Sequence, residues 1–174
     1  MWGGVIIEKN GLVYRGENMS KNMQNDILTN EDKFNNYKTQ MGRLKRALKS
    51  QFYLEALFIE YAIIEDRTEA ILRYENNSIK TKEGQFVSLD RKLNKILDIT
   101  REKKSLPNKY IKSEIIIEIK EWKEDRNRLI HALMKKQITT DEMISIVNRG
   151  EQLTKELNNM ATSYRRAVER KNNK

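Results

Sequence analysis

Apolar residues recur at intervals of three and four from residue 30 onward, the spacing that gathers them on one face of an α-helix. Asn30 can cap the first helix, and the apolar stripe behind it consists of Phe34, Tyr37, Met41, Leu44 and Leu48. Ser50 and Gln51 then mark either a break or a kink. The pattern predicts a first helix that ends before Gln51.

The segment from Phe52 to Tyr74 is the richest in apolar residues, which nearly encircle a helix between positions 52 and 64. A helix that is apolar on all sides is buried, so this segment is predicted to be the central helix. Its aromatic residues can pack in the core or stack on bases, and the core is the expected place. A polar loop with Asn76 and Gly84 follows. Ser88 can cap a shorter helix whose inward residues are Leu89, Leu93, Ile96 and Leu97.

Two further helices are predicted in the second half of the chain. One follows the only proline, Pro107, and runs over residues 110–136, with an apolar side formed by Ile115, Ile116, Ile119, Trp122, Leu129, Ile130 and Leu133. The other begins at Thr139, which forms a capping box with Glu142 and lies beside the hydrophobic staple of Ile138 and Met143. Its apolar face continues to residue 164, and the basic tail 165–174 is expected to fray.

Residues 1–28 differ from the rest, because two short β-prone runs flank Asn10-Gly11. This pattern indicates either a short hairpin or a loose N-terminal extension. Residues 29–174 are predicted to form an antiparallel bundle of about five helices, because short loops join successive helices. The expected fold class is therefore all-α.

The net charge of the chain indicates which class of partner it binds. Lys and Arg number 34 against 25 Asp and Glu, which gives a net charge of +9. This balance favours polyanionic partners, with RNA first and an anionic membrane surface second. The first helix has no acid between residues 38 and 49, and its polar side carries Lys38, Arg43, Lys45, Arg46 and Lys49. These cations form either a solvated face or a set of phosphate contacts.

Several protein classes are excluded by what the chain does not contain. It has no cysteine, so it forms no disulfide and no cysteine zinc site, which fits a cytoplasmic protein. No apolar run approaches the roughly 20 residues that span a bilayer. The N-terminus carries Glu8 early and lacks a long apolar core, so no signal peptide is expected. One histidine cannot build a histidine-rich metal centre.

That histidine, His131, carries the candidate chemistry together with Arg126 and Asn127. At about 100° per residue, His131 lies about 40° from Asn127 and about 140° from Arg126 around a helix. Asn127 and His131 therefore share a face, and Arg126 points toward Trp122 and Ile130. Histidine transfers protons near neutral pH, and arginine is a permanent cation suited to phosphate. The alternative is that all three are ordinary surface or boundary residues.

The run Arg126-Asn127-x-x-x-His131 resembles the motif of the HEPN superfamily (higher eukaryotes and prokaryotes nucleotide-binding), in which four to six residues separate an arginine from a histidine and a polar residue often follows the arginine. The resemblance implies a helical bundle, a homodimer, and metal-independent endoribonuclease activity without a cofactor. It also implies a toxin or virus-defence role, in which an inhibitory antitoxin or other partner protein binds the enzyme. One toxin group has a tyrosine two residues after the histidine, where this chain has Leu133. In some members an acid on an earlier helix supports the arginine, and here Glu65 or Asp66 could do so.

The expected reaction uses the RNA's own 2′-hydroxyl as the nucleophile. His131 would act as general base or acid, Arg126 would neutralise charge on the phosphorane, and Asn127 would orient His131 or bind phosphate, with Arg128 as a further RNA contact. Two chains would supply two histidines, so a symmetric dimer is expected, in which Trp122 and Leu133 either contact the partner or fill the core. The alternative function is a non-catalytic RNA-binding, nucleotide-binding or protein-interaction module.

Overall fold

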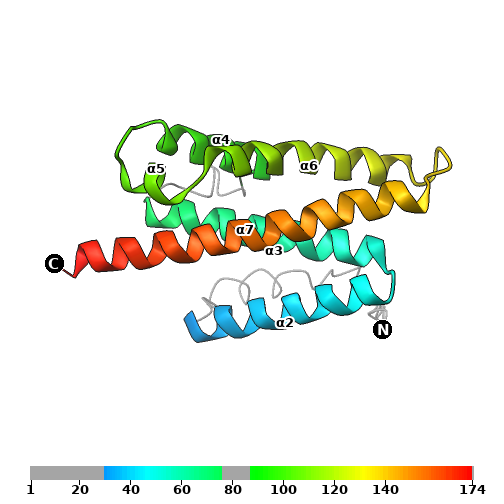
Figure 1. Ribbon diagram of the computed structural model, residues 1–174, viewed down its shortest axis with the longest axis horizontal. Helices are drawn as coiled ribbons and strands as arrows, with labels where there is room; N and C mark the ends of the chain where they lie inside the picture. The colour runs from blue at the N-terminus through cyan, green and yellow to red at the C-terminus, as the bar shows by residue number, and fades with distance from the viewer. Residues whose placement is uncertain (1–29, 76–86, 174) are drawn as a thin grey trace, which may run out of the picture. The chain divides into compact units, whose positions relative to one another are not determined.

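The computed structural model describes residues 30–75 and 87–173, and every regular element in those ranges is a helix (Figure 1). The all-α prediction is confirmed for this part of the chain. The helices are α2 (Asn30–Lys49), α3 (Tyr53–Tyr74), α4 (Leu89–Thr100), α5 (Leu106–Tyr110), α6 (Ser113–Ala132) and α7 (Thr140–Asn172). The hairpin expected within residues 1–28 lies outside the described residues.

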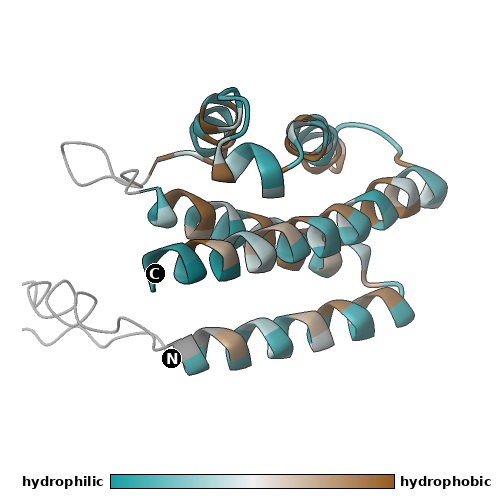
Figure 2. Cartoon of the chain, turned by 60° about the vertical axis from the view of Figure 1, so that its left-hand side comes forward, coloured by the Kyte–Doolittle hydropathy of each residue, from teal (hydrophilic) through white to brown (hydrophobic). Residues whose placement is uncertain are grey.

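The chain divides into a small unit, Met1–Asn36, and a large unit, Tyr37–Lys174. In the large unit, α3 packs against α7 and α4, and α6 packs against the same two helices, while the short α5 packs on α7 (Figure 1). Each helix carries apolar and hydrophilic residues along its length, as Figure 2 shows. Burying the apolar faces between these helices provides the main driving force for the fold. The largest fully buried side chains include Trp122, Tyr164, Leu57, Ile64 and Leu93.

Helix directions differ in part from the predicted antiparallel bundle. The indole of Trp122 donates a hydrogen bond to the carbonyl of Ile146 at 3.0 Å, and the Lys112 amide lies 3.3 Å from the sulfur of Met160. These two contacts show that α6 and α7 are antiparallel, as expected of helices that follow one another.

The prediction is wrong for α3 and α7, which run in the same direction (Figure 1). Gly150 faces Glu60 near the beginning of the pair, and the Tyr164 hydroxyl donates to the Glu75 carboxylate near its end. Short loops favour antiparallel packing of successive helices, but α4 also runs in the direction of α7, because both are antiparallel to α6. Because α3 and α7 are far apart in sequence, no such constraint applies to them.

The backbone at the helix ends explains two further comparisons between the predicted and the observed helices. The break between α2 and α3 is sharp, because Gln51 adopts a left-handed conformation with φ 59°. The helix predicted over residues 110–136 is shorter and forms α6, Ser113–Ala132, because the extended backbone of Ile111 separates it from α5, Leu106–Tyr110. Ser105 caps α5 by accepting a hydrogen bond from the Asn108 amide at 3.2 Å. The proline therefore starts a separate short helix before the longer one.

The last helix begins as predicted, because the Thr139 hydroxyl accepts a hydrogen bond from the Glu142 amide at 3.2 Å. It then extends to Asn172, through most of the segment that was expected to fray. Ala167 is buried in this segment, which gives its helix a packed face. Within the described ranges, no helix combines the length and the apolar composition needed to cross a membrane.

A carboxyl group lies in the core at the contact between α3 and α7. The Glu60 side chain is fully buried, and neither carboxyl oxygen has a hydrogen-bond partner among the described residues. Burial raises the pKa of Glu60 to about 9, with a smaller contribution from Glu151. The carboxyl is therefore protonated at neutral pH. Gly150 makes this packing possible, because an added Cβ would overlap the Glu60 carboxyl and lie 2.7 Å from the Trp122 indole nitrogen.

Glu60 should make the stability of the protein fall as pH rises. The folded state keeps the proton up to about pH 9, whereas the unfolded chain releases it near the ordinary value of 4.5. Between these two pH values, the free energy of unfolding therefore falls as pH rises, by at most about 1.4 kcal/mol per pH unit. Glu60→Gln should remove this decline in urea unfolding measured from pH 5 to pH 9. Glu151→Gln is the control and should keep most of it; equal slopes for Glu60→Gln and the parent protein would contradict the assignment.

Gly150→Ala should destabilise the protein by about 1–3 kcal/mol, the usual cost of overpacking a core. The new methyl group would push α7 away from Glu60 and Trp122. Gly42→Ala on α2 is the matched control, because its added Cβ meets only the flexible end of Arg46, at 3.6 Å. Alanine has the higher helix propensity, so the control should be neutral or stabilising by up to about 1 kcal/mol. Thermal unfolding of the two variants would compare them, and similar effects would argue against tight packing at Gly150.

Candidate functional site

The three residues of the motif lie near the end of α6, and Arg126 points toward α3. Its guanidinium carbon lies 4.6 Å from the ring centroid of Tyr61 and 5.2 Å from that of Phe58. Both rings belong to α3, and these are the distances of cation–π contacts. The arginine is therefore partly buried and held against an aromatic surface.

Asn127 is in direct contact with the arginine. Arg126 Nη1 donates a hydrogen bond to Asn127 Oδ1 at 3.1 Å, so the carbonyl end of the asparagine side chain faces the guanidinium. Arg126 Nε is buried and has no hydrogen-bond partner among the described residues. Two elements of the motif are thus brought together within one chain.

His131 lies one helical turn after Asn127, and its side chain is exposed to solvent. Met134, three residues later, is 96% exposed. The described hydrogen bonds and ion pairs do not link the imidazole to Arg126 or Asn127. Within one chain, the histidine is therefore accessible to a ligand or a second molecule.

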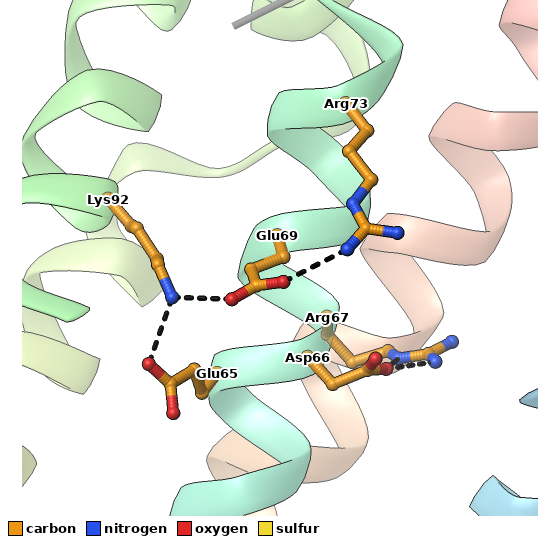
Figure 3. Close-up of polar contacts among 6 residues, drawn as sticks. All are labelled: Glu65, Asp66, Arg67, Glu69, Arg73 and Lys92. Carbon is orange, nitrogen blue, oxygen red and sulfur yellow. Dashed lines mark hydrogen bonds and ion pairs between the residues drawn. The ribbon is translucent and has the colours of Figure 1, made fainter. Parts of the chain in front are cut away.

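The two acids proposed to support Arg126 have other partners in the described part of the chain (Figure 3). Glu65 accepts a hydrogen bond from Lys92 at 2.9 Å, and Asp66 forms an ion pair with the neighbouring Arg67. Neither carboxylate is paired with Arg126 there. The described contacts of Arg126 with α3 are instead with the rings of Phe58 and Tyr61.

An ionic cluster lies beside this contact and connects three helices. Lys92 of α4 is fully buried and binds Glu65 at 2.9 Å and Glu69 at 2.6 Å, both on α3 (Figure 3). Burial lowers the pKa of Lys92, but the hydrogen bonds to Glu69 and Glu65 outweigh it, so the pKa is raised. Lys123 of α6 similarly binds Asp90 of α4 at 3.0 Å. Breaking a buried pair of this kind typically costs about 3–5 kcal/mol, so the cluster fixes α4 against its two neighbours.

The expected RNA-contacting cations all have exposed side chains. Those of α2 are Lys38, Arg43, Lys45, Arg46 and Lys49, all on the surface of that helix. Arg128 is also exposed and pairs with Asp125 on another side of α6, beside a shallow groove that continues to Ile138 and Ile146. None of the described hydrogen bonds or ion pairs joins these cations to Arg126 or His131.

Sequence analysis did not identify Phe58 and Tyr61 as residues of this site. They were assigned to the core of an evenly buried central helix, yet Phe58 is 57% exposed. Their spacing of three residues put both rings on one face of α3, and this was the available signal. What the sequence could not show is that Arg126 of α6 lies against that face.

Comparisons of the chain with protein-family models, with curated proteins and with solved structures found no match.

Proposed function

We propose that this protein is a metal-independent endoribonuclease of HEPN type that acts in the cytoplasm in a toxin or virus-defence role. The observation that carries the proposal is the contact between Arg126 and Asn127 on the last turns of α6, with His131 exposed one turn further on. An all-α chain with a net charge of +9 fits a helical module that binds RNA.

In the proposed reaction, a base removes the proton from the 2′-hydroxyl, and the 2′-oxygen attacks the adjacent phosphorus. The bond to the 5′-oxygen breaks, and an acid protonates that leaving oxygen. The products are a 2′,3′-cyclic phosphate and a 5′-hydroxyl. Arg126 binds the oxygens of the phosphorane, where negative charge is greatest. Asn127 holds the guanidinium at Nη1, and His131 transfers the proton.

A homodimer completes this scheme, because one chain has a single histidine and the reaction uses both an acid and a base. Leu54, Phe58 and Met134 are exposed apolar residues on α3 and just beyond the end of α6. They offer a surface that a second copy could cover, which would bring two His131 side chains to one cleft by symmetry. An inhibitory antitoxin or other partner protein would act by covering the same surface.

One observation favours the alternative of a non-catalytic RNA-binding or nucleotide-binding module. Arg126 lies on the aromatic rings of α3, and His131 has no described contact with it. An arginine and a basic surface are sufficient to bind phosphate, whereas cleavage also requires the imidazole to reach the same phosphate.

Purified protein should cleave single-stranded RNA in the presence of EDTA and leave DNA intact, because DNA lacks the 2′-hydroxyl. His131→Ala and Arg126→Ala should each reduce cleavage by about two orders of magnitude or more, and Asn127→Ala should reduce it less. The measurement is the rate of appearance of 2′,3′-cyclic phosphate ends.

Arg101→Ala is the matched control for Arg126→Ala. It removes the same charge from an exposed position at the end of α4 and should cleave normally. Circular dichroism should show that each variant remains helical. Undiminished cleavage by His131→Ala would reject the site, and the absence of cleavage by the parent protein together with tight RNA binding would favour the non-catalytic module.

Cleavage per chain should fall when the protein is diluted below its dimer dissociation constant, because each active cleft uses two histidines. Light scattering at several concentrations would give the dimer fraction, and the cleavage rate should follow it. Met134→Glu places a charge on the exposed apolar surface. Both the dimer fraction and the cleavage rate should then rise only at higher protein concentration. A monomer with undiminished activity would rule out the two-histidine mechanism.

A further inference from the structure

Among the described residues, Arg126 is held by aromatic rings rather than by a carboxylate. This affects how the arginine can bind a phosphate group of the RNA. The guanidinium carbon lies 4.6 Å from the Tyr61 ring and 5.2 Å from the Phe58 ring. The hydrogen bond to Asn127 fixes only one nitrogen, Nη1, at 3.1 Å. Together, Phe58 and Tyr61 form an aromatic clamp on the arginine.

The clamp restrains the arginine without neutralising it. An arginine side chain has several rotatable bonds, and ordering it for catalysis costs conformational entropy. A carboxylate partner would restrain the side chain, but it would also compete with a phosphate for the N–H groups. A ring attracts the cation through its face and does not accept hydrogen bonds from the N–H groups as a carboxylate would.

The two rings contribute unequally. Tyr61 is partly buried and closer to the guanidinium, whereas Phe58 is 57% exposed. A cation–π contact is stronger where water is excluded. Tyr61 therefore provides most of the restraint, and the more exposed Phe58 adds a weaker contact.

We propose that Tyr61 and Phe58 are positioning residues that hold the Arg126 guanidinium where it meets the scissile phosphate. This inference rests on the proposed endoribonuclease function and adds two residues to it. The reacting groups are still those of the RNA, His131 and Arg126. The clamp determines where the positive charge lies before RNA binds.

Single-turnover cleavage with excess protein tests this role. Tyr61→Leu should lower the cleavage rate about tenfold or more, because a displacement of about 1 Å at a reacting centre can cost a hundredfold. Its RNA affinity should change by less than about twofold, because the basic surface that binds RNA is intact. Tyr61→Phe keeps the ring and should cleave like the parent protein, while Phe58→Leu should lose less than Tyr61→Leu.

The chain supplies a matched control in a second pair of the same kind. Arg67 lies 5.2 Å from the ring of Tyr37, so Tyr37→Leu removes a cation–π contact that does not involve the motif. It should leave the cleavage rate unchanged. In an Arg126→Ala background, Tyr61→Leu should cause no further loss. Equal losses for Tyr37→Leu and Tyr61→Leu, or a full additional loss in that background, would overturn the proposal.

A second measurement separates this inference from the proposed function. In the RNA-free protein, the Arg126 Cδ protons should show an upfield ring-current shift by NMR, and Tyr61→Leu should reduce it. If this shift is present but the parent protein does not cleave RNA, the endoribonuclease proposal fails and the clamp stands as a restraint on a binding arginine. If the shift is absent, the clamp is rejected whether or not the protein cleaves RNA.

Discussion

The absence of a side chain at Gly150 is the constraint on which the rest of the bundle depends. At this position α7 comes close enough to α3 to bury Glu60 and close enough to α6 to meet Trp122. The Trp122 indole then donates to the carbonyl of Ile146, which fixes the register of α6 against α7. Because Arg126 lies one turn after Trp122 on the same helix, that register also determines where the arginine meets α3.

Arg126 can reach α3 because α4 is shorter than α6. α4 has 12 residues and spans about 18 Å, whereas the 20 residues of α6 span about 30 Å. Lys92 and Lys123 fix the first turn of α4 against α3 and α6. Since α4 and α6 are antiparallel, Arg126 and the residues after it lie beyond the beginning of α4. There the arginine bridges directly to Tyr61, and Phe58 stays exposed.

Local features of the fold could be predicted from the sequence, and features that join distant segments could not. The apolar period predicted the helices, and Thr139 with Glu142 predicted the beginning of α7, because both depend on neighbouring residues. The parallel packing of α3 and α7 depends on Glu60 and Gly150, which are 90 positions apart in the sequence. For the same reason the spacing of Arg126, Asn127 and His131 could be read from the sequence, while the rings that hold Arg126 and the lysine that binds Glu65 could not be predicted.

Glu60, Lys92 and Arg126 differ in how their charge is accommodated at the contacts between the helices. Glu60 is neutral because burial raises its pKa to about 9, and neither of its carboxyl oxygens has a hydrogen-bond partner among the described residues. Lys92 keeps its charge because two carboxylates neutralise it. Arginine is a permanent cation, and the contacts of Arg126 among the described residues are with the rings of Phe58 and Tyr61 and the side chain of Asn127. Its positive charge is therefore not matched by a carboxylate in the described part of the chain, and the guanidinium fork is suited to carboxylate and phosphate groups.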